Sequence, residues 1–165
     1  MKRISVGGRA WRRRSATVVV VALAAAALAE PGTSTPPQTA SGTAIQVASF
    51  FTGPPRFADG NVFLTQIAVS QAFGTFTGTM TQEATLVIHP GGTVNFRGIT
   101  TCVCTVDGRS GTLTFRVVGS GVSATEERQI HLFGFQGTGE LTGLHAELSF
   151  ETATSSYSGI YHFDP

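Results

Sequence analysis

Positive charge is scarce in this chain once its first 29 residues are set aside. Six of the eleven lysine and arginine residues lie in that segment, and the remainder has no lysine and five arginines against ten acidic residues, a balance of −5. Nucleic acids and anionic membrane surfaces are bound through clustered cations. The composition after residue 29 therefore argues against both as partners.

Known catalytic motifs are absent as well. The sequence has no G-x-S-x-G, so serine hydrolase chemistry has no support. His145 and Glu147 form an H-x-E pair, but the P-C-x-x-C half of the zinc deaminase signature is missing. We predict no metal and no cofactor, and the sequence leaves open whether the protein is an enzyme.

The N-terminal segment has the three parts of a secretory signal peptide. Basic residues fill positions 2–14, an apolar run of small residues covers 16–28, and Ala27-Leu28-Ala29 matches an A-x-A cleavage site. The apolar run is shorter than the roughly 20 residues that span a bilayer. We predict cleavage after residue 29, no stable membrane insertion afterwards, and a secreted, cell-envelope or periplasmic protein. The general secretory route is favoured over the twin-arginine route.

The rest of the chain divides into a linker and one domain. Residues 30–42 are rich in Pro, Ser, Thr and Gly without an apolar period, which predicts a disordered linker. Residues 43–165 are enough for a single domain with one core.

Short alternating segments separated by glycines predict that this domain is all-β. The expected strands cover residues 43–51, 61–73, 79–89, 93–106, 111–118, 128–136, 144–152 and 157–163. Pro54 and Pro55 should keep residues 52–60 in a loop. Eight sequential strands without a long crossover favour a closed up-and-down antiparallel barrel, which has no free edges.

Two turns fix the register of three strands. A two-residue Asp107-Gly108 hairpin turn places Thr100 opposite Phe115. A three-residue loop at 90–92 places Gln82 opposite Thr100, whereas a two-residue loop would turn the threonines of residues 79–85 inward. We prefer the three-residue loop because β-branched polar residues suit a solvated strand face.

This register predicts a pocket inside the barrel. The candidate ligand-binding residues are Met80, Gln82, Phe96, Thr100, Phe115 and His131. They combine apolar walls with a few hydrogen-bonding groups, as ligand pockets do. Gly98 faces the same interior and should leave room there. In the alternative, Gln82 and Thr100 bond each other or a buried water inside a filled core.

Cys102 and Cys104 are the only cysteines. At positions i and i+2 of a strand they point the same way, with Cα atoms about 6.5 Å apart. An exported protein favours oxidation to a disulfide. Two buried thiols, or half of a metal site, are the alternatives. Metal is the least favoured, because no further ligand has zinc-like spacing.

Three glycine-rich segments carry a family resemblance. They are GRSGTLTFRVVGSG (108–121), GTGELTGL (137–144) and YSGIYHFD (157–164). With them, residues 42–165 resemble a bacterial family of unknown function whose fold is similar to allene oxide cyclase and dirigent proteins. The resemblance implies a closed eight-stranded, calycin-like barrel. No position here matches the catalytic residues of the cyclase or the dirigent proteins, so none is transferred.

Three functions remain on these observations. The first is an exported barrel that binds a small apolar molecule. The second is a cyclase or isomerase acting on a polyene or polyketide-like substrate, which would work by shaping a reactive molecule and needs few catalytic groups. The third is a structural or interaction module with a filled core. The sequence does not predict an oligomeric state.

Overall fold

The computed structural model describes residues 34–125 and 127–164, which form eight strands and the turns between them. The signal peptide predicted at residues 1–29 lies outside the described residues. The strands are β1 (Gln38–Ala58), β2 (Asn61–Gly74), β3 (Thr77–Ile88), β4 (Thr93–Val106), β5 (Arg109–Val122), β6 (Arg128–Gly139), β7 (Leu144–Glu151) and β8 (Ser156–Phe163).

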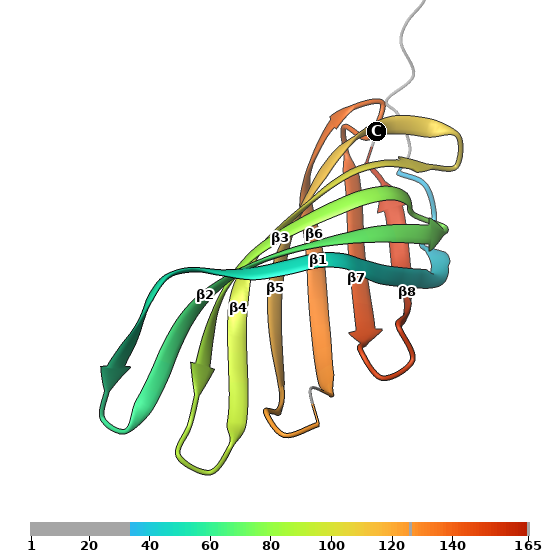
Figure 1. The fold of residues 1–165 in the computed structure, drawn as a ribbon. Helices are drawn as coiled ribbons and strands as arrows, with labels where there is room; N and C mark the ends of the chain where they lie inside the picture. Colours follow the sequence, from blue (N-terminus) through green and yellow to red (C-terminus); the bar gives the residue numbers. More distant parts are fainter. Residues whose placement is uncertain (1–33, 126, 165) are drawn as a thin grey trace, which may run out of the picture. The chain divides into compact units, whose positions relative to one another are not determined.

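These strands form one closed antiparallel ring. Each strand pairs with the next along the chain, and β8 pairs with β1. Figure 1 shows the sequential hairpins, coloured from blue at β1 to red at β8. The predicted all-β, eight-stranded, up-and-down barrel is confirmed. Within the described part of the chain, no helix has the length and apolar character needed to cross a membrane.

The predicted register is also confirmed. Thr100 pairs with Phe115 across the β4–β5 hairpin, and Gln82 pairs with Thr100 across the β3–β4 hairpin. Asp107 and Gly108 both have positive φ, 51° and 76°, as a two-residue hairpin turn of the primed type requires. Turn chemistry therefore determines which side chains of β3, β4 and β5 point into the barrel.

β1 departs from the prediction at both of its ends. It begins at Gln38, inside the predicted linker, because residues 38–43 pair with β8 and close the ring. It also continues through Pro54 and Pro55, where we predicted a loop, and ends at Ala58. The register shifts between Thr52 and Arg56, so both prolines lie in a bulge, a place in a sheet that tolerates a missing N–H donor.

The ring is not equally closed along its length. β1 pairs with β8 only from Gln38 to Thr43, whereas its pairing with β2 runs on to Ala58. We call the end with the β2–β3, β4–β5 and β6–β7 turns the closed end. The end with the β1–β2, β3–β4, β5–β6 and β7–β8 turns is called the open end (Figure 1).

A dense aromatic cluster fills the closed end. The Phe76 ring is fully buried and makes edge-to-face contacts with Phe115, Tyr157 and Tyr161, at centroid distances of 6.0, 6.1 and 6.0 Å. Such aromatic contacts add to the stabilisation from burial itself. The cluster blocks the barrel, so any interior space has to lie toward the open end.

Candidate functional site

The interior of the open half is hollow. A cavity of about 580 Å³ is lined in part by residues of the β5–β6 and β7–β8 turns, and its volume is within the range of about 300–1,000 Å³ typical of small-molecule sites. Its apolar wall includes Ala68, Met80, Phe96, Ile130, Leu132 and Phe150. Its polar side chains include Ser49, Gln66, Ser70, Gln82, Thr100 and Arg128. The filled core that we considered as an alternative is therefore confined to the closed half.

Four of the six predicted pocket residues line this cavity: Met80, Gln82, Phe96 and Thr100. Phe115 points inward as predicted, but it is fully buried against Phe76 and lies outside the cavity lining. The prediction placed Phe115 correctly on the inner face and could not show that the aromatic cluster covers it.

The prediction that His131 faces the interior is wrong. His131 is exposed on the outer face of β6, where its Nδ1 lies 3.3 Å from Ser149 Oγ. Phe133 and Phe135, which share its line, are 42% and 50% exposed. The inward residues are instead Ile130 and Leu132, because β6 carries apolar residues on both faces and the larger aromatics take the outer one.

Tyr157 belongs to the floor of the cavity. Its hydroxyl accepts a hydrogen bond from the Phe76 backbone N–H at 2.9 Å and lies 3.1 Å from the Phe73 carbonyl, to which it donates. Burial raises the pKa of Tyr157 above its ordinary value of 10.0, while the Phe76 hydrogen bond lowers it. The hydroxyl is therefore neutral at physiological pH and serves to hold the β2–β3 turn.

Thr100 is the most deeply buried polar side chain of the cavity, with 2% of its surface exposed. Its hydroxyl has no hydrogen-bond partner in the structure. The predicted alternative, in which Thr100 and Gln82 bond each other, is therefore not seen. Gln66 is different, because its amide donates a hydrogen bond of 2.6 Å to Ser49 Oγ. Thr100 keeps an unused hydrogen-bonding group facing the cavity.

Arg128 begins β6 at the open end and lies across the interior. Its guanidinium carbon is 5.9 Å from the centroid of the Phe96 ring, within the range of a cation–π contact. Two glycines of β5 make room for this pair. A Cβ atom at Gly121 would come within 2.8 Å of Arg128 Cγ, and one at Gly119 would overlap the Phe96 ring. The Arg128 Nε atom is buried without a partner.

The backbone of Arg128 is anchored to the β7–β8 turn. Its N–H donates to Thr152 Oγ1 at 2.8 Å, and the Thr152 N–H donates to the Arg128 carbonyl at 3.1 Å.

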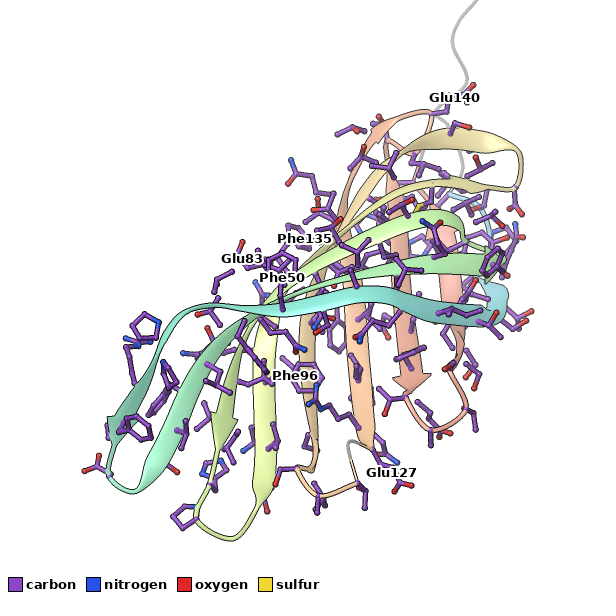
Figure 2. All side chains as sticks on the ribbon, in the orientation of Figure 1. Phe50, Glu83, Phe96, Glu127, Phe135 and Glu140 are labelled. Atoms are coloured by element: carbon purple, nitrogen blue, oxygen red, sulfur yellow. A yellow bond between two sulfur atoms is a disulfide. The ribbon has the colours of Figure 1, made fainter. Side chains whose placement is uncertain are left out.

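In Figure 2, Phe96 lies in the interior between the strands, and Glu127 lies at the open end. Glu140 lies at the opposite end in the same view.

Two lining residues, Arg128 and Gln66, were not among those predicted from the sequence. Gln66 could have been found by extending the register to β2, and Arg128 only once the inner face of β6 is known. Arg128 shares the inner face with Ile130 and Leu132, once those two are assigned inward. Gln66 pairs with Ala84 on β3, so extending the β3–β4 register by one strand places it inside.

Gly98 does not leave room in the barrel, contrary to our expectation. It pairs with Ala84 as predicted, but a Cβ atom there would lie 2.8 Å from Ala84 Cβ and would overlap the Glu83 carbonyl. Gly98 is a point where two strands approach closely, and the cavity lies beside Met80 and Phe96 instead.

The remaining reactive side chains lie away from the cavity lining. Cys102 and Cys104 form a disulfide and are almost fully buried, with Cα atoms 5.4 Å apart. His145 and His162 stack on each other and both approach the Asp164 carboxylate, at 2.9 and 3.5 Å. Among residues 34–125 and 127–164, no cluster of three His, Cys, Asp or Glu side chains could hold a metal ion.

Comparison with known families identifies the chain. Residues 43–164 match the model of a family described as protein of unknown function (DUF3224). The chain belongs to the DUF3224 family. This membership confirms the predicted resemblance to a family of unknown function, and the match covers all of the barrel except residues 38–42 of β1.

A solved structure of a DUF3224 protein supports the fold. The crystal structure of a family member of unknown function from Shewanella oneidensis MR-1 matches with a TM-score of 0.62 at 18% sequence identity. The match covers 79% of this chain and 99% of that one. At this identity the likeness establishes the architecture alone. No curated protein sequence matches the chain.

Proposed function

We propose that this DUF3224 protein is an exported barrel that binds a small molecule with an apolar body in its cavity. The observation that carries the proposal is the 580 Å³ cavity, whose wall combines apolar and polar side chains. Apolar walls give affinity through burial, and placed polar groups orient the ligand.

The barrel architecture supports a preformed site. The wall strands are held by the hydrogen-bonded ring, and the aromatic cluster around Phe76 closes one end. A ligand can therefore enter only through the open end or past the part of β1 that does not pair with β8. A rigid wall reduces the ordering cost of binding.

A cyclase or isomerase of the allene oxide cyclase type is the second function that the sequence raised. Acid–base chemistry inside the barrel needs a titratable group there. The titratable side chains of the lining are Glu127, Arg128 and Tyr157. Glu127 is exposed at the open end, and the Tyr157 hydroxyl is occupied by the β2–β3 turn. These positions favour binding over catalysis.

Binding is tested with the neutral apolar dye Nile red. Ala68 faces the cavity beside Gln82, and Ala68→Phe should fill it. Ala48 lies on the outer face of β1 opposite Val69, so Ala48→Phe adds the same volume outside. The parent and Ala48→Phe should enhance dye fluorescence equally, and Ala68→Phe should not. Equal enhancement of dye fluorescence by the parent and both variants would contradict the proposal, because the dye would then bind on the outer surface.

Export is tested separately. The signal-peptide pattern ending at Ala29 predicts that the mature protein begins at Glu30. Intact-mass measurement of protein recovered outside the cytoplasm should give this N-terminus. Exported protein that retains residues 1–29 would contradict the prediction.

A further inference from the structure

Two polar atoms in the cavity wall are unusual in this molecule. Among the described residues, the buried side-chain nitrogen and oxygen atoms without a partner are Thr100 Oγ1 and Arg128 Nε. Both residues line the same cavity. Buried polar groups are normally hydrogen-bonded, and a group left without a partner destabilises the fold. Their joint position in the cavity indicates that a ligand supplies the missing partners.

The two groups lie at different depths. Thr100 and Phe96 both point inward from β4 and are four residues apart, which corresponds to about 13 Å along a strand. The Arg128 guanidinium lies over Phe96, toward the open end, whereas Thr100 pairs with Phe115 at the edge of the aromatic cluster. A single small polar group cannot reach both positions.

On the β6 side, the wall between these depths is apolar. On β6, Ile130 pairs with Gly119 and Leu132 pairs with Val117. Both aliphatic side chains therefore lie along the path from Arg128 to Thr100. Both side chains are more than nine-tenths buried. The part of the ligand that faces β6 must therefore be apolar.

The charge at the outer position is positive. Arg128 is the cation of the lining, and its guanidinium is partly removed from water by the Phe96 ring. Arg128 is half-buried with a buried Nε that has no partner, and a guanidinium binds a carboxylate through two parallel hydrogen bonds. Glu127, the neighbouring acid, is exposed and forms no ion pair with Arg128 in the structure.

We propose that the ligand is an apolar carboxylic acid whose carboxylate binds Arg128 and whose far end carries a hydrogen-bonding group that reaches Thr100. This inference rests on the proposed function and specifies the ligand of the same cavity. Phe96, against which the Arg128 guanidinium lies, is about 13 Å from Thr100 along β4, and this length corresponds to a chain of about eleven bonds, since three backbone bonds span 3.3–3.6 Å.

The test uses displacement of Nile red by three probes of one length: decan-1-ol, decanoate and 10-hydroxydecanoate. At pH 7.4 the two acids are ionised, because carboxyl groups have pKa values near 4. The parent should bind decanoate about tenfold to a hundredfold more tightly than decan-1-ol, because of the charge-assisted hydrogen bonds to Arg128. It should bind 10-hydroxydecanoate about threefold to tenfold more tightly than decanoate.

Variants locate the two contacts. Arg128→Gln should abolish the preference for decanoate over decan-1-ol, and Arg128→Lys should restore part of it. The control is Arg97→Gln, because Arg97 is exposed and lines a separate hollow of about 410 Å³ together with Arg56. Thr100→Val should abolish the preference for the hydroxyl group alone, with Thr101→Val, on the opposite face of β4, as its control.

Several outcomes would overturn the inference, and they differ from failure of the proposed function. Equal displacement by decanoate and decan-1-ol would leave cavity binding intact and refute the role of Arg128. If Arg97→Gln and not Arg128→Gln lost the preference for decanoate over decan-1-ol, the carboxylate would bind in the separate hollow lined by Arg97. No displacement by any of the three probes would refute this ligand class. Only failure of Nile red to bind the parent would refute the cavity as a binding site.

Discussion

At the closed end of the barrel the Tyr157 hydroxyl accepts a hydrogen bond from the Phe76 N–H and donates one to the Phe73 carbonyl, 3.1 Å away. The Thr100 hydroxyl, which faces the cavity and is as deeply buried, has no partner. The Tyr161 hydroxyl, also at the closed end, lies 2.6 Å from Asp107 Oδ2. The buried tyrosine hydroxyls of the filled end are thus hydrogen-bonded, whereas the buried threonine hydroxyl that faces the hollow is not.

Packing differs in the same way between the two ends. Phe76 is fully buried among three other rings, while Phe51, which lines the cavity, is 56% exposed. Close packing and satisfied hydrogen bonds stabilise a fold, and unused volume with unused polar groups is typical of a binding site. The closed end therefore provides the stability that the open end lacks.

The strongest test of this contrast is truncation of one phenylalanine at each end. Phe76→Ala should lower the free energy of unfolding by about 3–5 kcal/mol, because it leaves a cavity in a packed cluster. Phe51→Ala should change it by only about 0.5 kcal/mol, since that ring is already half exposed. Urea unfolding of both variants measures the difference. Similar losses would mean that the two ends contribute equally.

Alkaline pH should weaken the closed end selectively. Burial, with smaller contributions from the nearby Asp107 carboxylate, raises the pKa of Tyr161 to about 12, from 10.0 in the unfolded chain. The unfolded state then loses its proton first, so the stabilisation is complete below pH 10 and is lost as pH rises to 12. The loss should reach about 2–3 kcal/mol. The raised pKa of Tyr157 acts in the same direction.

Few other groups interfere with this measurement. The only lysine in the chain is Lys2, and both cysteines are in the disulfide. Urea unfolding at pH 9 to 12 should show the loss in the parent and a smaller one in Tyr161→Phe. An unchanged pH dependence in Tyr161→Phe would assign the effect to other groups.

The sequence predicted the fold and part of the cavity, because both depend on local information. Asp107-Gly108 and the three-residue loop at 90–92 fix the pairing of β3, β4 and β5, and so bring Gln82 and Thr100 together. The pattern of β7, which alternates with one apolar face, is also reflected in the structure: Leu144 and Leu148 are buried. For these strands, the residues of the turns and the alternation of side chains between the two faces were enough to predict which side chains point inward.

The features that the sequence did not predict depend on contacts between distant segments. β6 is apolar on both faces, so parity alone could not assign His131 outward and Arg128 inward. The register also shifts beside Phe115, where Phe135 is the extra residue on β6, so the β5–β6 pairing cannot be extended along the strand without a break. Likewise, the depth to which the aromatic cluster fills the barrel depends on Phe76, which the sequence places only in a turn.

Gly98 shows the same limit and gives a third test. Gly98→Ala should lower the free energy of unfolding by about 1–3 kcal/mol, because the new Cβ would overlap the backbone of β3. Gly91→Ala is the matched control, since no atom lies within 4 Å of a Cβ at that position. Thermal unfolding compares the two. A harmless Gly98→Ala would restore our original expectation of free space beside Ala84.

The smallest effect concerns Thr100 and has the opposite sign. Thr100→Val should raise the free energy of unfolding by about 1 kcal/mol, because it replaces a buried hydroxyl without a partner by a methyl group of similar shape. Thr101→Val, one residue away and facing outward, should have no such effect. Urea unfolding of the ligand-free protein measures both. A loss of stability in Thr100→Val would mean that the hydroxyl is satisfied by ordered water. A gain would mean that the open end retains a polar group at the expense of stability, as binding sites do.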